Sequence, residues 1–132
     1  MDLTDFFSRD AYARLTGIRM IDVGQGTARV SMKIREEHLN SHGTVHGGAI
    51  FTLADTAFAL ASNSHGIPAA AINASITYMK AAREGELFAD AGEFAENPKL
   101  ATYVVTVTDD SGDRIALFQG MVYRKPKRDL VN

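Results

Sequence analysis

Two chemically distinctive features lie close together in the stretch 43–64. Gly47 and Gly48 stand where a helix is expected to begin, and Asp55 is the only formally charged residue of the stretch. Free N–H groups at a helix N-terminus can polarise a carbonyl or hold an oxyanion, and glycine there lets a ligand approach the backbone closely. A carboxylate inside an apolar helix is costly unless it is paired, hydrogen-bonded or functional. The stretch therefore offers a donor for a carbonyl oxygen and a carboxylate that needs an explanation.

The spacing of these two features predicts how they can meet. Asp55 follows Gly47 by eight residues, which corresponds to ~12 Å along a helix axis. One carbonyl group cannot contact both residues of the same helix, so they act on one substrate only if they come from two subunits. A two-fold dimer with antiparallel helices would arrange them so. Asp55 also shares a stripe with Phe51, Phe58 and Ser62, a mostly apolar lining that suits an acyl or aryl group.

The helix that carries these residues is predicted to be buried. From Gly48 onward it lacks Pro and Gly and is rich in Ala and Leu, until His65 and Gly66 stop it. Its apolar residues spread around most of the circumference, which is typical of a buried helix. One sheet face cannot cover such a helix unless the sheet curls around it or a second subunit contributes. The pattern therefore predicts oligomerisation.

The rest of the sequence predicts a short helical segment and several strands. Within residues 2–16, Asp2 or Thr4 can cap a first turn, and Asp10 can cap a second turn before Gly17. Alternating apolar and polar residues predict strands at 18–23, 27–34, 70–79, 86–96, 99–108 and 114–124. Consecutive strands joined by tight turns form an antiparallel sheet. One long helix and one sheet must bury each other, so we expect an α+β fold.

Length and composition exclude several classes of protein. The 132 residues suit a single domain, 1–132, with a helical segment at 1–16 and a charged tail at 125–132. A net charge of −2 gives no basic surface for nucleic acid or membrane binding. The absence of cysteine excludes disulfides, thiolate metal sites and a cysteine nucleophile. It also fits a reducing compartment, and the N-terminus has no signal pattern, so we expect a cytoplasmic protein.

The histidines do not predict a metal site. His42 and His46 have the i, i+4 spacing of zinc ligands on a helix, but they precede the helix and no H-E-x-x-H sequence is present. We therefore expect no metal and no organic cofactor. Ser41 beside His42 lacks the G-x-S-x-G context of a serine hydrolase. His38 and His65 are expected on the surface.

The order of these residues resembles the hot-dog-fold acyl-CoA thioesterases of the phenylacetate-degradation (PaaI-like) type. The resemblance extends from about residue 17 to residue 124. The segments that carry it are His38-Leu39-Asn40, Gly43-Thr44-Val45-His46-Gly47-Gly48, Leu53-Ala54-Asp55-Thr56-Ala57, Ser75-Ile76-Thr77-Tyr78-Met79 and Ala116-Leu117-Phe118-Gln119-Gly120. It implies a curved antiparallel sheet wrapped around one long central helix, and a homodimer or a homotetramer built as a dimer of dimers.

The same resemblance implies a thioesterase for a small acyl-CoA, including an aryl or phenylacetyl-type acyl group. By resemblance, Asp55 is the nucleophile or general base, and the Gly47 amide polarises the thioester carbonyl. Asn40, which alone would be interpreted as a turn residue, helps to place the thioester or the attacking water. His46 supports the loop and contacts the thioester.

The residues expected to bind substrate are Gly48, Phe51, Thr56, Phe58 and Ser75, with Tyr78 and Met79 as further candidates for the lining. The sequence departs from the family pattern at Ala71, where some relatives carry a hydroxyl group that assists the water. Ser75 or Thr56 could substitute for it. Two other functions stay open at this point: a hot-dog module that binds acyl-CoA without cleaving it, and a hydratase or dehydratase on the same fold.

Overall fold

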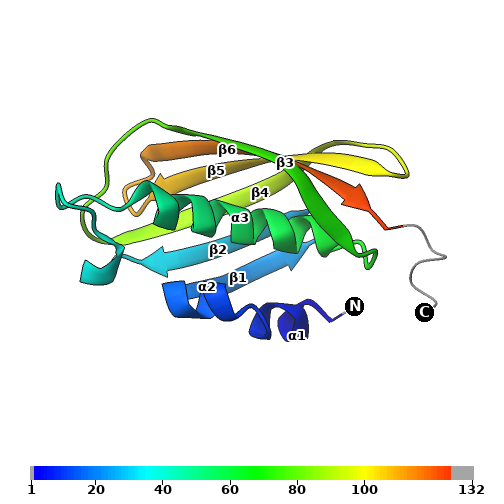
Figure 1. Ribbon diagram of the computed structural model, residues 1–132, viewed down its shortest axis with the longest axis horizontal. Helices are drawn as coiled ribbons and strands as arrows, with labels where there is room; N and C mark the ends of the chain where they lie inside the picture. Colours follow the sequence, from blue (N-terminus) through cyan, green and yellow to red (C-terminus); the bar gives the residue numbers. More distant parts are fainter. Residues whose placement is uncertain (1, 126–132) are drawn as a thin grey trace.

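The computed structural model describes residues 2–125, in which six antiparallel strands form one sheet and the long helix α3 lies across one of its faces (Figure 1). The helices are α1 (Leu3–Ser8), α2 (Ala11–Thr16) and α3 (Gly47–Asn63), with a 3-10 turn at Glu36–His38. The strands are β1 (Ile18–Gly24), β2 (Thr27–Lys33), β3 (Ala69–Tyr78), β4 (Glu86–Glu96), β5 (Leu100–Asp109) and β6 (Arg114–Arg124). The predicted elements are all present. Beyond Lys125, the predicted charged tail lies outside the described residues.

The apolar side of helix α3 faces the sheet and packs mainly on β2, β4 and β5. The fully buried aliphatic residues of this side are Ile50, Leu53, Ala54, Ala57, Leu60 and Ala61. Burial of each large side chain contributes ~1.5–3 kcal/mol. Phe58 packs under Gly120 of β6 so closely that a Cβ at position 120 would lie 2.6 Å from its ring. Glycine at 120 is therefore required for this approach of helix and strand.

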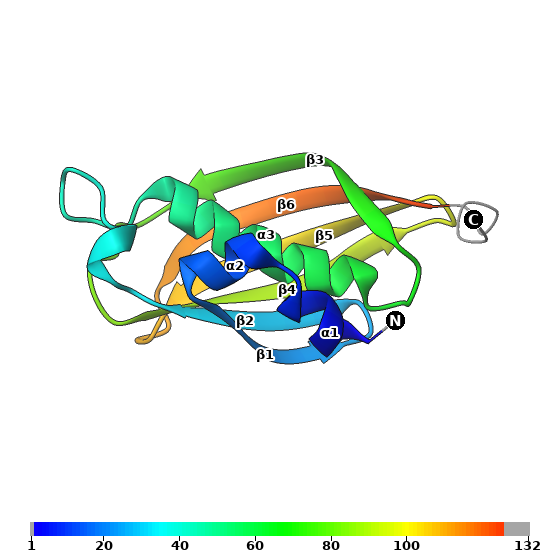
Figure 2. The same cartoon turned by 60° about the horizontal axis from the view of Figure 1, so that its bottom comes forward.

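One stripe of α3 is left uncovered by residues 2–125. Gly48, Thr52, Asp55 and Ala59 follow one another at helical spacing, and all four keep accessible surface. The sheet lies behind α3, and α1 and α2 lie along the side of α3 that is nearer to β1 (Figure 2). The prediction that one sheet face cannot cover this helix is thus consistent with the structure.

The two N-terminal helices begin and end where the capping residues predict. The Asp2 carboxylate accepts the Thr4 N–H at 2.9 Å, and the Asp10 carboxylate accepts the Ala13 N–H at 3.0 Å. Gly17 ends α2 with a φ of +84°, a left-handed conformation that glycine adopts without strain. These local interactions place α2 beside α3 and β1.

The strand order is β1-β2-β4-β5-β6-β3. Strand β3 therefore leaves its neighbours in sequence and pairs with β6 at the edge of the sheet. The register shifts between Ala71 and Asn73, so Ile72 is extra in β3. The alternation expected over 70–79 is wrong across this irregularity, because the bulge turns Ala71 to the same face as Ala74.

Within the described part of the chain, no helix has both the length and the apolar character to cross a membrane. The cytoplasmic location stays a prediction.

Candidate active site

The loop that precedes α3 is organised by Asn40. Its side-chain oxygen accepts the backbone N–H groups of His42 at 2.9 Å and Thr44 at 3.2 Å, and its amide nitrogen lies 3.0 Å from Thr44 Oγ1. The main chain closes the same loop, since Asn40 N–H donates to Thr44 O at 2.8 Å. Asn40 thus holds the loop shape directly. Thr44 was not predicted as a site residue, although a hydroxyl four residues after Asn40 is a usable signal for such a contact.

The start of α3 leaves one backbone donor without a partner. His46 is the N-cap, and its Nδ1 accepts the Gly48 N–H at 2.9 Å. The Ala49 and Ile50 N–H groups donate to His46 O. No acceptor for the Gly47 N–H lies among residues 2–125. Of the two glycines, Gly47 is therefore the one whose amide is available to a ligand.

The ring of His46 is oriented by this cap. Because Nδ1 accepts a hydrogen bond, the neutral ring carries its proton on Nε2. The side chain is exposed, so Nε2–H can donate to a group that lies over the start of the helix.

Asp55 is a half-buried carboxylate on the open stripe of α3. No residue of the described range donates a hydrogen bond to it or forms an ion pair with it. Its pKa is raised above the ordinary value, first because burial disfavours the charged form and second because the charge of Asp10 repels it. A raised pKa brings a carboxylate closer to the range in which it acts as a general base near neutrality.

Three of the predicted substrate-binding residues lie away from this open stripe. Thr56 is buried, and its hydroxyl donates to Thr52 O at 2.7 Å. Phe58 is a core residue between Phe118 and Tyr103. Within one chain, neither residue reaches the surface beside Asp55. The sequence could not predict this, because a helical wheel that is apolar all round does not distinguish the side that faces the sheet from the side that is open.

Ser75 is the third. It pairs with Gln119 and lines a hollow on the face of the sheet away from α3. It therefore cannot replace, within the same chain, the hydroxyl that the sequence lacks at Ala71, which is on the helix-facing side. Phe51 remains half-buried next to Asp55 on the helix, with its ring 5.4 Å from that of Phe118.

Two hollows flank the start of α3. One, of about 480 Å³, lies between α2 and α3 and includes His46, Gly48 and Thr52 in its lining. The other, of about 370 Å³, lies between the start of α3 and the end of β3 and includes Gly47 and Tyr78. Gly47 therefore borders one of the two hollows, and its neighbours His46 and Gly48 border the other.

A family model described as the thioesterase superfamily matches residues 42–116, which is more than half of the chain. The chain belongs to this superfamily. The thioesterase is 50% identical over 119 residues to a putative esterase of Archaeoglobus fulgidus, a match that covers 89% of this chain and 77% of the relative. It is 34% identical over 119 residues to the acyl-coenzyme A thioesterase PaaI of Escherichia coli, with coverage of 89% and 85%.

Solved structures agree with these relatives. The PaaI protein from the phenylacetic acid degradation operon of E. coli superposes with a TM-score of 0.90 at 33% identity, covering 93% of this chain and 90% of that chain. A Streptococcus mutans protein solved with bound acetyl-CoA superposes with a TM-score of 0.79 at 28% identity, covering 83% and 90%. The α+β hot-dog fold, the PaaI-like resemblance and the assignment as a thioester hydrolase are confirmed.

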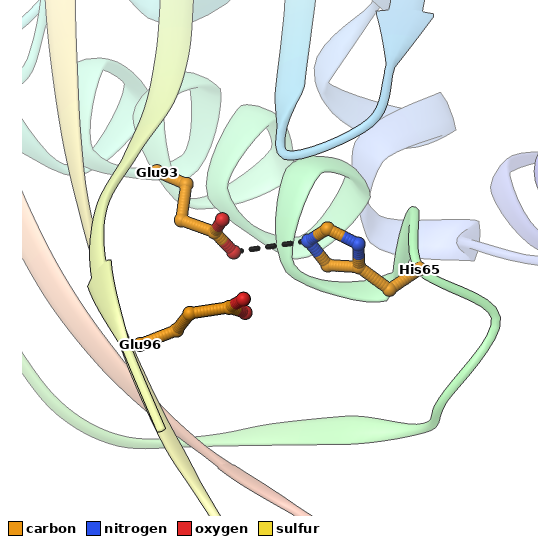
Figure 3. Close-up of side chains that lie close together, drawn as sticks. All are labelled: His65, Glu93 and Glu96. Atoms are coloured by element: carbon orange, nitrogen blue, oxygen red, sulfur yellow. Dashed lines mark hydrogen bonds and ion pairs between the residues drawn. The ribbon is translucent and has the colours of Figure 1, made fainter. Parts of the chain in front are cut away.

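One further cluster of the thioesterase has the composition of a metal site. His65, Glu93 and Glu96 lie near the end of α3 that is remote from Gly47, and their ligand atoms lie within 4.8 Å of one another (Figure 3). The guanidinium of Arg124 already occupies the space between the carboxylates, 3.3 Å from Glu93 and 2.5 Å from Glu96. This cation supplies the charge that a metal ion would bring, so the residues fit an ion-pair network better than a metal centre.

The cluster corrects the expectation that two histidines lie on the surface. His65 is half-buried and hydrogen-bonded to Glu93 at 2.9 Å. His38 is buried, with Nε2 2.7 Å from Thr16 O, while its Nδ1 accepts the Arg35 N–H at 2.9 Å. The hydrogen-bond partners of both histidines include residues more than 20 positions away in the sequence, which composition does not reveal.

Proposed function

We propose that this thioesterase hydrolyses a small acyl-CoA, including aryl or phenylacetyl-type acyl groups, to the free acid and CoA. The proposal draws on the E. coli relative, which is an acyl-CoA thioesterase, and on the S. mutans relative with acetyl-CoA. Half-buried Phe51 beside Asp55 supports an aromatic acyl group.

The observation that carries the mechanism is that the free donor and the unpaired carboxylate are on one rigid helix, ~12 Å apart. We infer that Asp55 of one subunit faces Gly47 of a second subunit. Strand β3 supports this inference. It is an edge strand without a charged residue, and eight of its ten residues are exposed. Such an edge is suited to pairing with a second copy, and the open stripe of α3 would be covered at the same time.

In the proposed reaction, the Gly47 N–H donates to the thioester oxygen and stabilises the negative charge that develops there. Asp55 of the facing subunit either attacks the carbonyl carbon or takes a proton from the attacking water. In both routes the carbon–sulfur bond breaks, the CoA thiol leaves, and one water molecule is consumed to give the acid. Asn40 holds the loop around the reacting group, and His46 Nε2–H donates to the thioester or to the water.

The first experiment measures thiol release from a panel of acetyl-, phenylacetyl- and benzoyl-type CoA thioesters. We expect release by the wild type and a loss of about 10³-fold in kcat for Asp55→Asn, with circular dichroism unchanged. Asp22→Asn, an exposed acid on β1, is the matched control and should retain activity. Equal rates for Asp55→Asn and wild type would refute the assignment.

The second experiment tests whether two subunits build one site. Gly47 is the first residue of α3, a position that tolerates proline. Gly47→Pro therefore removes the N–H group. Gly47→Ala is its control, because alanine also adds a Cβ but keeps the N–H group. Co-expressed Gly47→Pro and Asp55→Asn chains should recover about a quarter of wild-type activity, because half of randomly paired dimers are mixed and each has one intact site of two. No recovery would contradict a shared site. Sedimentation velocity distinguishes a dimer from a dimer of dimers.

A further inference from the structure

The peptide group that joins Gly47 to Gly48 is held at both of its polar atoms. Tyr78, the last residue of β3, donates from its hydroxyl to Gly47 O at 2.9 Å. On the other end of the same peptide, the Gly48 N–H donates to His46 Nδ1 at 2.9 Å. Side chains from two elements far apart in sequence therefore fix the orientation of one peptide plane in the first turn of α3.

Glycine at position 47 is part of this arrangement. Its backbone is helical, so no positive φ requires glycine there. A Cβ at this position would lie 3.0 Å from both Cζ and Oη of Tyr78. The missing side chain thus makes room for the Tyr78 ring as well as for a ligand.

The contact joins two parts of the proposed site. Tyr78 is half-exposed on the edge strand and lines the hollow beside the Gly47 backbone. The Gly47–Gly48 peptide that it holds comes directly after the peptide with the free Gly47 N–H. Its own N–H, that of Gly48, donates the hydrogen bond that orients the His46 ring. The Gly47 N–H belongs to the preceding peptide, which shares the Gly47 Cα with the held one. A displacement of the held peptide would therefore shift this Cα and the N–H attached to it, and would release the His46 ring from its hydrogen bond. Small misalignments of such donors lower rates strongly.

We propose that Tyr78 is a positioning residue of the thioesterase, whose hydroxyl anchors the Gly47 carbonyl so that the N–H of the adjoining His46–Gly47 peptide and the His46 ring point at the thioester carbonyl. This inference rests on the proposed function, since it assigns Tyr78 a role through the Gly47 amide. Tyr78 acts through the backbone and does not itself touch the reacting atoms.

The test uses Tyr78→Phe, which removes one oxygen atom and keeps the ring. Tyr123→Phe is the matched control, because Tyr123 is exposed on β6 and pairs with Ala70 near the start of β3, eight residues before Tyr78. We expect Tyr78→Phe to lower kcat about 10-fold with KM changed less than about 2-fold, since one oriented hydrogen bond is lost while the binding surface is kept. Tyr123→Phe should match wild type.

A binding experiment separates positioning from general structural damage and does not depend on turnover. One probe is phenylacetyl-CoA with a methylene in place of the thioester sulfur, which keeps the carbonyl. The other is 2-phenylethyl-CoA, which lacks it. Tyr78→Phe should bind the carbonyl probe about 5- to 10-fold more weakly and the second probe as wild type does.

Equal affinity of Tyr78→Phe and wild type for the carbonyl probe would overturn the role of Tyr78, whatever Asp55→Asn does. An equal loss for both probes would also overturn it, because the effect would then be on the binding surface in general. Activity retained by Asp55→Asn would refute the proposed function, a separate outcome measured on a different variant.

Discussion

Asp55 on α3 and Glu93 on β4 are both partly buried carboxylates, but their surroundings differ in kind. Asp55 has no hydrogen-bond or ion-pair partner among residues 2–125, and burial followed by the charge of Asp10 raises its pKa. Glu93 accepts hydrogen bonds from Tyr103 at 2.8 Å and lies 2.9 Å from His65 Nε2.

The pKa of Glu93 responds in the opposite direction. Burial alone raises it, but the hydrogen bonds from Tyr103 and His65 and the charges of His65 and Arg124 outweigh burial and hold the pKa below its ordinary value. The partners also join the loop after α3 to β4, β5 and β6. The paired acid therefore stabilises the fold, whereas Asp55, which lacks such partners among residues 2–125, is the acid for which we propose a catalytic role.

The largest expected effect separates activity from stability at Asp55. Asp55→Asn should lower kcat/KM about 10³-fold and raise the free energy of unfolding at pH 7, because it removes a half-buried charge that has no partner among residues 2–125. Thiol release and urea titration measure the two quantities. A clear loss of stability would mean that Asp55 is a structural acid like Glu93.

The next largest effect is expected on stability, when the ion-pair cluster around Glu93 is broken. Arg124 is buried, and Arg124→Met would leave two carboxylates without their cation, so we expect the free energy of unfolding to fall by about 2–3 kcal/mol. The half-exposed side chain of Glu96 keeps this value below that of a fully buried pair. The rate constant kcat of the remaining folded protein should stay within about 2-fold.

The control for this variant is Arg29→Met, which breaks the exposed pair with Asp90, 3.7 Å apart. It should change the free energy of unfolding by no more than about 0.5 kcal/mol. Equal losses for the two arginine variants in urea titration would show that the cluster adds nothing beyond a surface pair.

A smaller effect appears in the pH dependence of stability. Because the pKa of Glu93 is lowered on folding, its contribution to stability is present above the ordinary carboxyl pKa and is lost as the pH falls through the folded-state value. Glu93→Gln should therefore be less stable than wild type by about 1 kcal/mol at pH 7, and the difference should shrink in acid.

Substitution of Asp55 should change the free energy of unfolding in the opposite direction in the same measurement. Its raised pKa means that its charge destabilises the folded state at neutral pH, and protonation in acid removes that cost. Relative to wild type, Asp55→Asn should be more stable at pH 7 and approach wild type in acid. Urea titrations from pH 3.5 to pH 7 that gave both variants the same sign would contradict the comparison.

The smallest expected effect concerns Asp10. Asp10→Asn removes the like charge that raises the pKa of Asp55 but keeps an N-cap for α2, because asparagine caps as well as aspartate. The acidic limb of the profile of kcat/KM against pH should move to lower pH. Asp2→Asn, the same change at the cap of α1, should leave the profile unchanged. A shift to higher pH would exclude the proposed repulsion.

The sequence predicted the elements whose signals are local. The start of α3 at Gly47, its end before His65 and the caps at Asp2 and Asp10 depend on residues within one or two turns of each other. Asp55 was predictable as a candidate because a single charge in an apolar helix is a local anomaly. The family resemblance had already singled out the Gly47 amide as the donor, and the structure adds a physical reason, because the His46 side chain accepts the Gly48 N–H.

The sequence by itself determined the helix, the strands and the spacing between the amide and the carboxylate, since each follows from backbone geometry over a few residues. Only the tertiary structure decided that β3 crosses to pair with β6, that a bulge at Ile72 shifts its faces, and that Tyr78 reaches Gly47. It also decided that Thr56 and Phe58 are turned inward. In the described part of the chain, it gave partners to Glu93 and none to Asp55. These outcomes depend on contacts between residues tens of positions apart, for which alternation and helical periodicity carry no information.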